Sequence, residues 1–169
     1  MTNGVVMKDK PIKNIMSEPE TYYSINSKYD RLIGVLGGSR AVGYDIQNDI
    51  DLIALTRRGL PKSVLASVCF VLGVSMEKMS GLLHISHRTL QRKKDDEFLN
   101  AYSTEQILEI AQLISHGIQV FGTIERFKKW VHQDVRALSY KMPIDYLDTT
   151  FGIKMVRDVM GRIEHGVYS

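Results

Sequence analysis

Apolar residues recur at intervals of three and four along most of this chain, which is the spacing of one face of an α-helix. The first such pattern is expected to stop at Gly37 and Gly38, and the second covers residues 49–55. A nearly all-apolar helix is predicted to start at Pro61 and to end at Gly73, because proline is well tolerated at the first helical position. Few segments alternate apolar and polar residues, so the predicted fold class is all-α.

The second half of the chain opens with a predicted helix-capping signal. Ser103 and Gln106 have the spacing of a capping box, in which a hydroxyl and a glutamine side chain satisfy free backbone N–H groups at a helix start. Gly122 is suited to end the helix that follows. The apolar face of that helix comprises Ile107, Ile110, Ala111, Ile114, Ile118 and Phe121.

Three further helices are predicted in the remainder of the chain. Thr123 is expected to cap the first of them, in which Trp130 should lie in the domain core. A short helix starts at Pro143 and is broken by Gly152, and the last helix ends at Gly166. The second half therefore reads as a small helical domain.

The stretch 76–94, MEKMSGLLHISHRTLQRKK, predicts two short helices around a tight turn. Ser86 is a good N-cap for the second helix, and Leu90 is its only strongly apolar residue, so Leu90 should point inward. No carboxylate lies between Lys78 and Lys94, so nothing local repels a polyanion. This pattern is typical of a helix-turn-helix, which places its second helix in the DNA major groove.

The polar side of the second helix carries groups that can donate hydrogen bonds to phosphates or base edges. The predicted DNA-binding residues are Ser86, His87, Arg88, Gln91, Arg92 and Lys94. Two positions depart from the usual motif: His84 stands where glycine is common, and Lys93 stands where a second inward apolar residue is expected. A plain amphipathic helix pair, or a helix-turn-helix used only for dimerisation or packing, remains an alternative.

Composition permits nucleic-acid binding without requiring it. A chain of 169 residues, 44% of them hydrophobic, can form one or two small packed domains. Its net charge of +3 and pI of about 8.9 give only a mild basic excess. The single Cys69 is expected to be buried and forms no intramolecular disulfide, which suits a reducing cytoplasm. The chain start lacks an apolar signal core and the longest apolar run, 64–74, is too short to span a bilayer, so we expect a cytoplasmic protein with no membrane partner.

Enzymatic interpretations have little support in the sequence. The glycine-rich stretch 34–43 lacks the Gly-Lys-Ser/Thr ending of a phosphate-binding loop. His84 and His87 are three residues apart, but no cysteine or nearby carboxylate completes a metal site. Nothing brings serine, histidine and aspartate together. We therefore predict no catalytic residue, no metal, no cofactor and no enzymatic activity.

Three strings in the second half, FGTIERFKKWV, MPIDYLDTTFG and VMGRIEHGVYS, resemble the C-terminal toxin-binding domain of Xre-type antitoxins, the family that includes Xre, MbcA and ParS. Upstream, residues 59–61 and 86–92 resemble the Xre-type DNA-binding domain of the same family. The resemblance covers about residues 30–169 and departs from the family pattern at 133–135 and 139–140. The residues that carry it in the second half are Phe121, Gly122, Trp130, Pro143, Leu147, Thr149, Gly152, Gly161, Arg162, Ile163 and Gly166.

This resemblance implies an antitoxin of a type II toxin–antitoxin system. Its toxin would be a RES-domain protein, a class that resembles ADP-ribosyltransferases and consumes NAD, and the antitoxin's C-terminal domain would block the toxin's active-site cleft. The antitoxin would also bind operator DNA and repress its own operon, as a homodimer or a larger toxin–antitoxin complex. A stand-alone helix-turn-helix transcriptional regulator without a toxin partner, or a pure interaction protein, is the alternative.

The expected organisation has three parts: a flexible N-terminal arm (1–28), a helix-turn-helix DNA-binding and dimerisation domain (29–100), and a toxin-binding domain (101–169). A terminal segment with charges and an aromatic tip could enter a cleft built for a charged dinucleotide. For Tyr168 an ordinary frayed terminus is an equally good interpretation. The predicted toxin-binding residues are Arg162, Glu164, His165, Val167, Tyr168 and Ser169.

Overall fold

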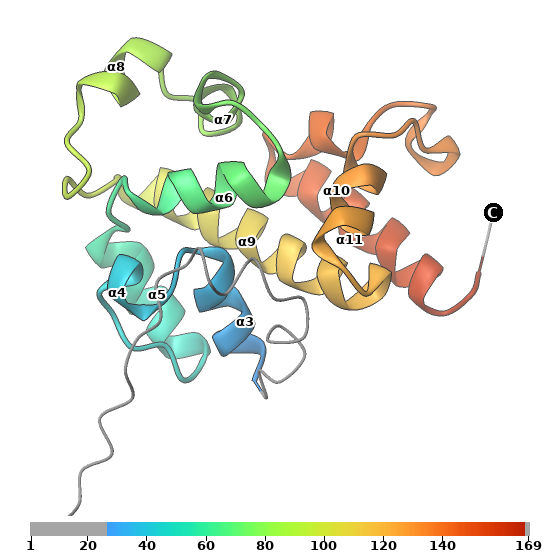
Figure 1. The fold of residues 1–169 in the computed structure, drawn as a ribbon, viewed down its shortest axis with the longest axis horizontal. Coiled ribbons are helices and arrows are strands. Elements are labelled where there is room, and N and C mark those ends of the chain that lie inside the picture. Colours follow the sequence, from blue (N-terminus) through green and yellow to red (C-terminus); the bar gives the residue numbers. More distant parts are fainter. Residues whose placement is uncertain (1–26, 168–169) are drawn as a thin grey trace, which may run out of the picture.

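The computed structural model describes residues 27–167, and within this range the regular elements are helical, as the sequence predicted (Figure 1). The α-helices are α3 (Lys28–Val35), α4 (Ser39–Val42), α5 (Asp49–Arg58), α6 (Val64–Leu72), α7 (Met76–Leu82), α8 (His87–Arg92), α9 (Ala101–Phe121), α10 (Ile124–Val131) and α11 (Thr150–Glu164). Two short 3-10 helices, η1 (Arg136–Leu138) and η2 (Pro143–Tyr146), lie between α10 and α11. Ser27 caps α3, whereas residues 1–26 of the expected arm lie outside the described range.

The long helix α9 runs through the middle of the molecule and is buried along most of its length (Figure 1). Helices α3, α5 and α6 contact it from the first half of the chain, and α10 and α11 contact it from the second. Arg157 donates to Glu109 at 2.9 Å and His116 Nε2 lies 3.0 Å from Glu164 Oε2. Both pairs are 48 residues apart, so α9 and α11 run in the same direction.

Buried side chains from both halves form one hydrophobic cluster. Its largest fully buried side chain is Phe127, which packs against Gly117 so closely that a Cβ there would collide with the ring. Trp130, predicted to be a core residue, packs against this cluster but stays partly exposed. Cys69 is buried as predicted, and burial raises the pKa of its thiol to about 11.

The predicted capping box at Ser103 is wrong. Helix α9 begins at Ala101, and its cap is Asn100, whose side-chain oxygen accepts the Ser103 backbone N–H at 2.8 Å. Ser103 is buried inside the helix, and its hydroxyl has no hydrogen-bond partner among the described residues. Asn and Ser are equally good caps, so two candidates three residues apart compete and the sequence alone favours neither.

Two other predicted boundaries are displaced. Pro61 forms an isolated bridge with Phe98, and α6 starts three residues later, at Val64. Gly152 does not break a helix: it lies in the first turn of α11, where the Thr149 hydroxyl accepts its N–H at 3.1 Å. A side chain at Gly152 would collide with the Tyr146 carbonyl group, so close backbone approach explains this glycine.

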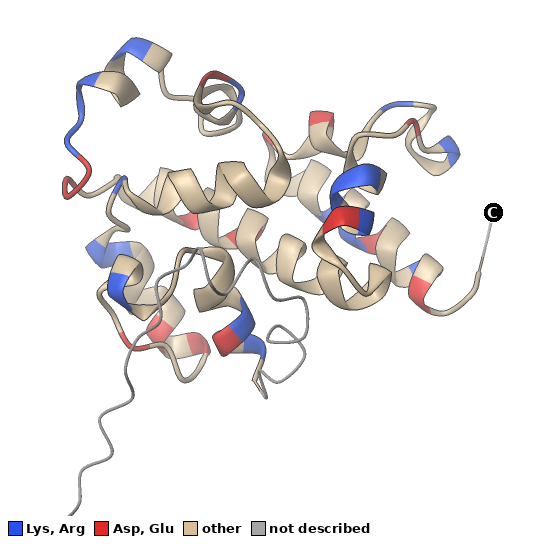
Figure 2. Ribbon diagram, in the orientation of Figure 1, with Lys and Arg blue, Asp and Glu red and all other residues tan. Residues whose placement is uncertain are grey.

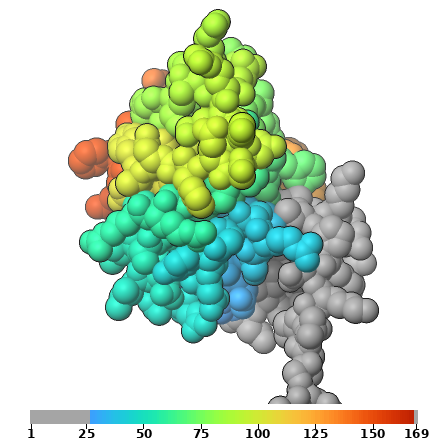
Figure 3. Space-filling model, turned by 90° about the vertical axis from the view of Figure 1, so that its left-hand side faces the viewer, coloured from blue at the N-terminus to red at the C-terminus, as the bar shows by residue number. Residues whose placement is uncertain are grey.

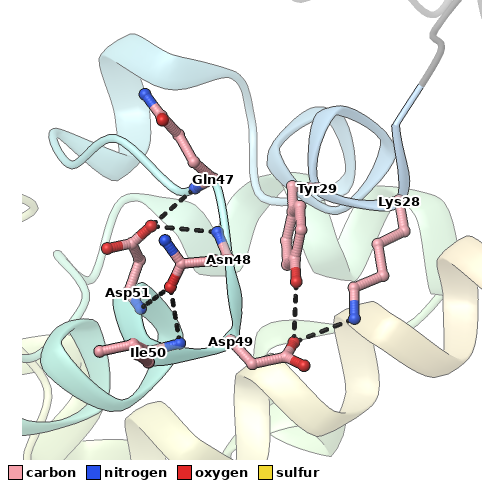
Figure 4. A network of polar contacts seen from close by, with 7 residues as sticks. All are labelled: Lys28, Tyr29, Gln47, Asn48, Asp49, Ile50 and Asp51. Atoms are coloured by element: carbon pink, nitrogen blue, oxygen red, sulfur yellow. Dashed lines mark hydrogen bonds and ion pairs between the residues drawn. The ribbon is translucent and has the colours of Figure 1, made fainter.

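Polar contacts join the start of α5 to α3 (Figure 4). Asn48 and Asp51 form a capping box at the start of α5. Asp49 accepts hydrogen bonds from Lys28 and Tyr29, both at 2.9 Å. The bond from Lys28, then that from Tyr29, lowers the pKa of Asp49, and the bond to Asp49 raises the pKa of Lys28. Because Lys28 and Asp49 are exposed to solvent, their ion pair contributes little to the free energy of unfolding.

Among residues 27–167 no single helix is long and apolar enough to cross a membrane. The pairs α6–α7 and α9–α10 would each reach that length and apolarity together, but they bend by 100° and 112° at the break.

Candidate functional sites

Helices α7 and α8 form the predicted helix-turn-helix. Two backbone hydrogen bonds close the turn. The Ile85 N–H donates to the Ser80 carbonyl oxygen at 3.0 Å, and the His84 N–H donates to the Gly81 carbonyl oxygen. Ser86 caps α8 by accepting the backbone N–H of Thr89 at 3.0 Å, as predicted. Leu90 is fully buried and is the only buried residue of α8. One face of α8 is thus anchored, and the rest is turned outward.

His84 has a reason to stand where glycine is usual. It adopts the left-handed conformation, with a φ of 53°, which a histidine tolerates at some cost. Its Nε2 atom lies 2.8 Å from the Asp148 carbonyl oxygen, a contact that glycine cannot make. Nearby, Lys78 of α7 donates to Asp145 at 2.9 Å. Together these bonds tie the helix-turn-helix to the segment before α11.

Lys93 is explained by the end of α8. The helix stops at Arg92, so Lys93 is a C-cap with extended backbone and does not face the core as the next inward position would. Its ammonium group donates to the Phe98 carbonyl oxygen at 3.1 Å and lies 3.5 Å from Glu97. The loop after α8 is therefore held by Lys93.

The exposed side of α8 forms a basic surface that projects at one end of the molecule (Figure 2). Arg88, Gln91 and Arg92 are exposed, and Arg88 and Arg92 are one helical turn apart. His87 is half-buried, and Lys94 lies beyond the helix. The structure thus brings five of the six predicted DNA-binding residues to α8 and its cap.

Lys94 differs from the arginines because a carboxylate lies beside it. Glu97 accepts the Lys94 backbone N–H at 3.1 Å. This bond, followed by the neighbouring Lys93, lowers the pKa of the Glu97 carboxyl. Glu97 therefore stays ionised near Lys94 and weakens its attraction for a polyanion.

A second basic segment lies at the same end of the molecule. Figure 3 shows α8 above α4 and α5 on one continuous face. Helix α5 ends in Arg57 and Arg58, which were not among the predicted DNA-binding residues. The Arg58 guanidinium donates to the Gly43 carbonyl oxygen at 2.6 Å and lies over the rings of Tyr44 and Phe98.

At the opposite end, α10, η1 and the end of α11 border a groove of about 530 Å³, which we call the arginine groove. Its charged lining residues are Arg126, Arg136 and Arg162. Apolar contacts come from Val120, Phe121, Trp130, Val135, Ala137, Val159, Ile163 and Val167. The rings of Phe121 and Trp130 lie with centroids 4.9 Å apart. Within residues 27–167 no carboxylate lines this groove.

Two family models match this chain. Residues 51–112 match the antitoxin Xre-like helix-turn-helix domain, and residues 116–166 match the antitoxin Xre/MbcA/ParS C-terminal toxin-binding domain. The chain belongs to the Xre/MbcA/ParS antitoxin family. Both matched domains are regulatory, so this antitoxin is not an enzyme.

Two known antitoxins and one solved structure are similar to this chain. The antitoxin Xre of Photorhabdus laumondii subsp. laumondii is 25% identical over 132 residues, which cover 77% of this chain and 89% of that protein. The Prs ADP-ribosylating antitoxin of Sphingobium sp. is 25% identical over 130 residues, covering 71% and 82%. Among solved structures, a chain of the M. tuberculosis MbcT–MbcA toxin–antitoxin complex matches with a TM-score of 0.47 and 17% identity, covering 64% of this chain and 96% of that one.

The predicted toxin-binding residues of the antitoxin do not all point the same way. Arg162 and Val167 line the arginine groove. Glu164 instead reaches His116 of α9, and His165 is an exposed helix cap. Tyr168 and Ser169 lie outside the described residues.

Arg126 and Arg136 were not among the residues predicted from the sequence, and Trp130 was predicted to lie in the domain core. One signal was available, because Arg126 and Trp130 are four residues apart and so share a face of α10. Arg136 reaches the groove through η1 after an irregular loop, which no local pattern predicts. The described residues contain no group of three His, Cys, Asp or Glu side chains that could hold a metal ion.

Proposed function

We propose that this antitoxin neutralises a RES-domain, NAD-consuming toxin by occluding its active site, and that it represses its own operon by binding operator DNA. The observation that carries the proposal is that the matched toxin-binding domain ends in an exposed segment, beyond a helix anchored to the core. The RES-domain partner rests on the sequence resemblance. It is supported by the relative named as an ADP-ribosylating antitoxin, because RES domains resemble ADP-ribosyltransferases.

In this mechanism α11 acts as a rigid support for the chain end. Its residues Ile153, Val156 and Met160 are buried, so little conformational freedom of the helix is lost on binding. Arg162 would pair with a toxin carboxylate, and Tyr168 would supply apolar area and a hydroxyl inside the cleft. The cleft is then closed to a charged dinucleotide.

On DNA, α8 would lie in the major groove, with Arg88, Gln91 and Arg92 toward base edges and phosphates. A homodimer would read two half-sites about 34 Å apart, one turn of the double helix. Residues 29–100 would then present the DNA-binding surface and residues 101–169 the toxin-binding surface. Operon repression would place the chain in the cytoplasm.

Co-expression with a RES-domain protein from the same operon tests the proposal. The full chain should co-purify with that protein and restore growth, whereas a chain ending at Gly166 should fold but lose rescue. The double variant Arg88→Ala, Arg92→Ala is the matched control and should rescue growth fully. If the full chain neither binds nor rescues, the proposal is wrong; operator binding without a protein complex would instead favour a stand-alone transcriptional regulator.

The same control variant tests the DNA half of the proposal. In operator titrations it should bind more weakly, and the slope of log affinity against log salt should fall by about one for each lost phosphate contact. An unchanged slope would mean that α8 does not contact DNA.

A further inference from the structure

We propose that the arginine groove binds an acidic segment of the toxin that also carries an apolar side chain. This inference rests on the proposed function and adds a second, separate contact to the inserted chain end. It also assigns Arg126, Arg136 and Trp130 as interface residues, none of which was expected from the sequence.

Charge complementarity is the first argument. Among the described residues every charged side chain that lines the groove is an arginine, and the acidic residues adjacent in sequence to lining positions do not line it; these are Glu125, Asp134, Asp158 and Glu164. Arg126 and Arg136 are both exposed and approach the groove from different elements, α10 and η1. Guanidinium groups bind carboxylates through paired hydrogen bonds, so an acidic segment is the occupant they favour.

The apolar floor is the second argument. Trp130 and Phe121 are both partly exposed, and each lies near the fully buried Phe127, with ring centroids 6.4 Å and 6.3 Å from it. Their positions are thus set by the core before any partner arrives. Aromatic and arginine side chains in such settings contribute most of the affinity in many interfaces.

Position is the third argument. Val167 lines the groove and immediately precedes the chain end that we propose enters the toxin cleft. A toxin holding that end must therefore place the rim of its cleft over the groove. Another exposed apolar surface, formed by Phe151 and Met155 on α11, lies beside Lys154 and Asp158 and so has no single preferred charge.

The first test measures toxin affinity for matched charge-reversal variants. The double variant Arg126→Glu, Arg136→Glu should bind the RES-domain toxin at least about tenfold more weakly, and its binding should depend less on salt. The control, Lys129→Glu with Lys154→Glu, makes the same change in charge on exposed residues that do not line the groove, and it should change affinity by less than about threefold. If charge reversal impairs folding, the double variant Arg126→Gln, Arg136→Gln takes its place and should also weaken toxin binding.

Two results of this test would overturn the groove while the proposed function stands. One is unchanged affinity in the groove variants when the wild-type chain binds the toxin. The other is an equal loss in the control, which would show an effect of net charge alone.

The second test uses no toxin. Trp130 is the single tryptophan of the chain, so its fluorescence reports directly on the groove. A short synthetic peptide with two glutamates beside a leucine should change the emission in a saturable way, and its glutamine counterpart should not. The change should disappear in the Arg126→Glu, Arg136→Glu variant.

The two tests separate the groove from the proposed function. If the chain binds the acidic peptide but does not bind the toxin, the groove does prefer acidic peptides, but the claim that the segment comes from the toxin is wrong. Absence of any response to the acidic peptide, with normal toxin binding by the groove variants, would overturn the inference entirely.

Discussion

Helices α8 and α11 carry the two proposed binding surfaces, but they are attached to the molecule very differently. Helix α8 has six residues, of which only Leu90 is buried. Helix α11 has 15 residues, five of them buried, and two of its side chains pair with α9. The helix proposed to read DNA thus has one buried side chain, whereas the helix that supports the proposed toxin-binding end is part of the common core.

Direct contacts hold the rest of the helix-turn-helix region to the second half. Lys128 and His132 of the α10 region lie 2.9 Å and 2.8 Å from the carbonyl oxygens of Phe70 and Leu72, at the end of α6. Both carbonyl groups belong to the last turn of α6, where helical carbonyl groups lack the usual partner one turn further on; the Phe70 oxygen also accepts the N–H of the cap residue Gly73. Damage to α10 should therefore reach both halves, while damage to α8 should remain local.

The largest effect is expected for Phe127→Ala. Emptying the site of this fully buried ring should lower the free energy of unfolding by about 3–5 kcal/mol, measured by urea denaturation. Trp130 is on the same helix but partly exposed, so Trp130→Ala should lower the free energy of unfolding clearly less than Phe127→Ala does. Relative to its loss of stability, Trp130→Ala should lose more toxin affinity than Phe127→Ala. If the two substitutions destabilise equally, the assignment of Phe127 to the core and Trp130 to the surface is wrong.

Leu90→Ala should separate the two surfaces. Removing the one buried side chain of α8 should cost about 2–4 kcal/mol locally, so α8 detaches and operator binding is lost. Toxin affinity should stay within about twofold of wild type, because α8 packs mainly against α7 and does not line the arginine groove. Hydrogen exchange would locate the change, and loss of protection in α11 would contradict this local picture.

Much of the fold could be predicted because its signals are local. Ser86 as a cap, Leu90 as the inward residue, and Gly73 and Gly122 as helix ends are each read within one turn of the chain. The family resemblance supplied the toxin-binding residues at the chain end, which stay a prediction. Such local signals fix where helices lie but not which of their faces becomes a binding surface.

The wrong predictions concern positions whose burial or backbone contacts are set by residues far away in the sequence. Phe127 and Trp130 are three residues apart on α10, and Phe127 is the buried one because Gly117 of α9 leaves space for its ring. Gly152 looks like a helix breaker until the Tyr146 carbonyl group is seen against it. Arg136 reaches the arginine groove only through the path of an irregular loop.

The misassigned cap of α9 gives a smaller but sharper test. Asn100→Ala should lower the free energy of unfolding by about 1 kcal/mol, because the Ser103 N–H loses its acceptor. Ser103→Ala should change it by less than about 0.5 kcal/mol, because that hydroxyl makes no described hydrogen bond. Thermal unfolding of both variants compares them directly, and the reverse order would restore the capping box predicted from the sequence.

The smallest net effect is expected at His84, where two opposing terms meet. His84→Gly should relieve about 1 kcal/mol of left-handed backbone strain but lose a bond to the Asp148 carbonyl oxygen worth about the same, so stability should barely change. His84→Ala keeps the strain and loses the bond, so it should be about 1 kcal/mol less stable than the glycine variant. Equal losses in both, by urea denaturation, would show that the side-chain bond outweighs the backbone. In that case the tie between the helix-turn-helix and the segment before α11, rather than the turn geometry, would be the reason for this histidine.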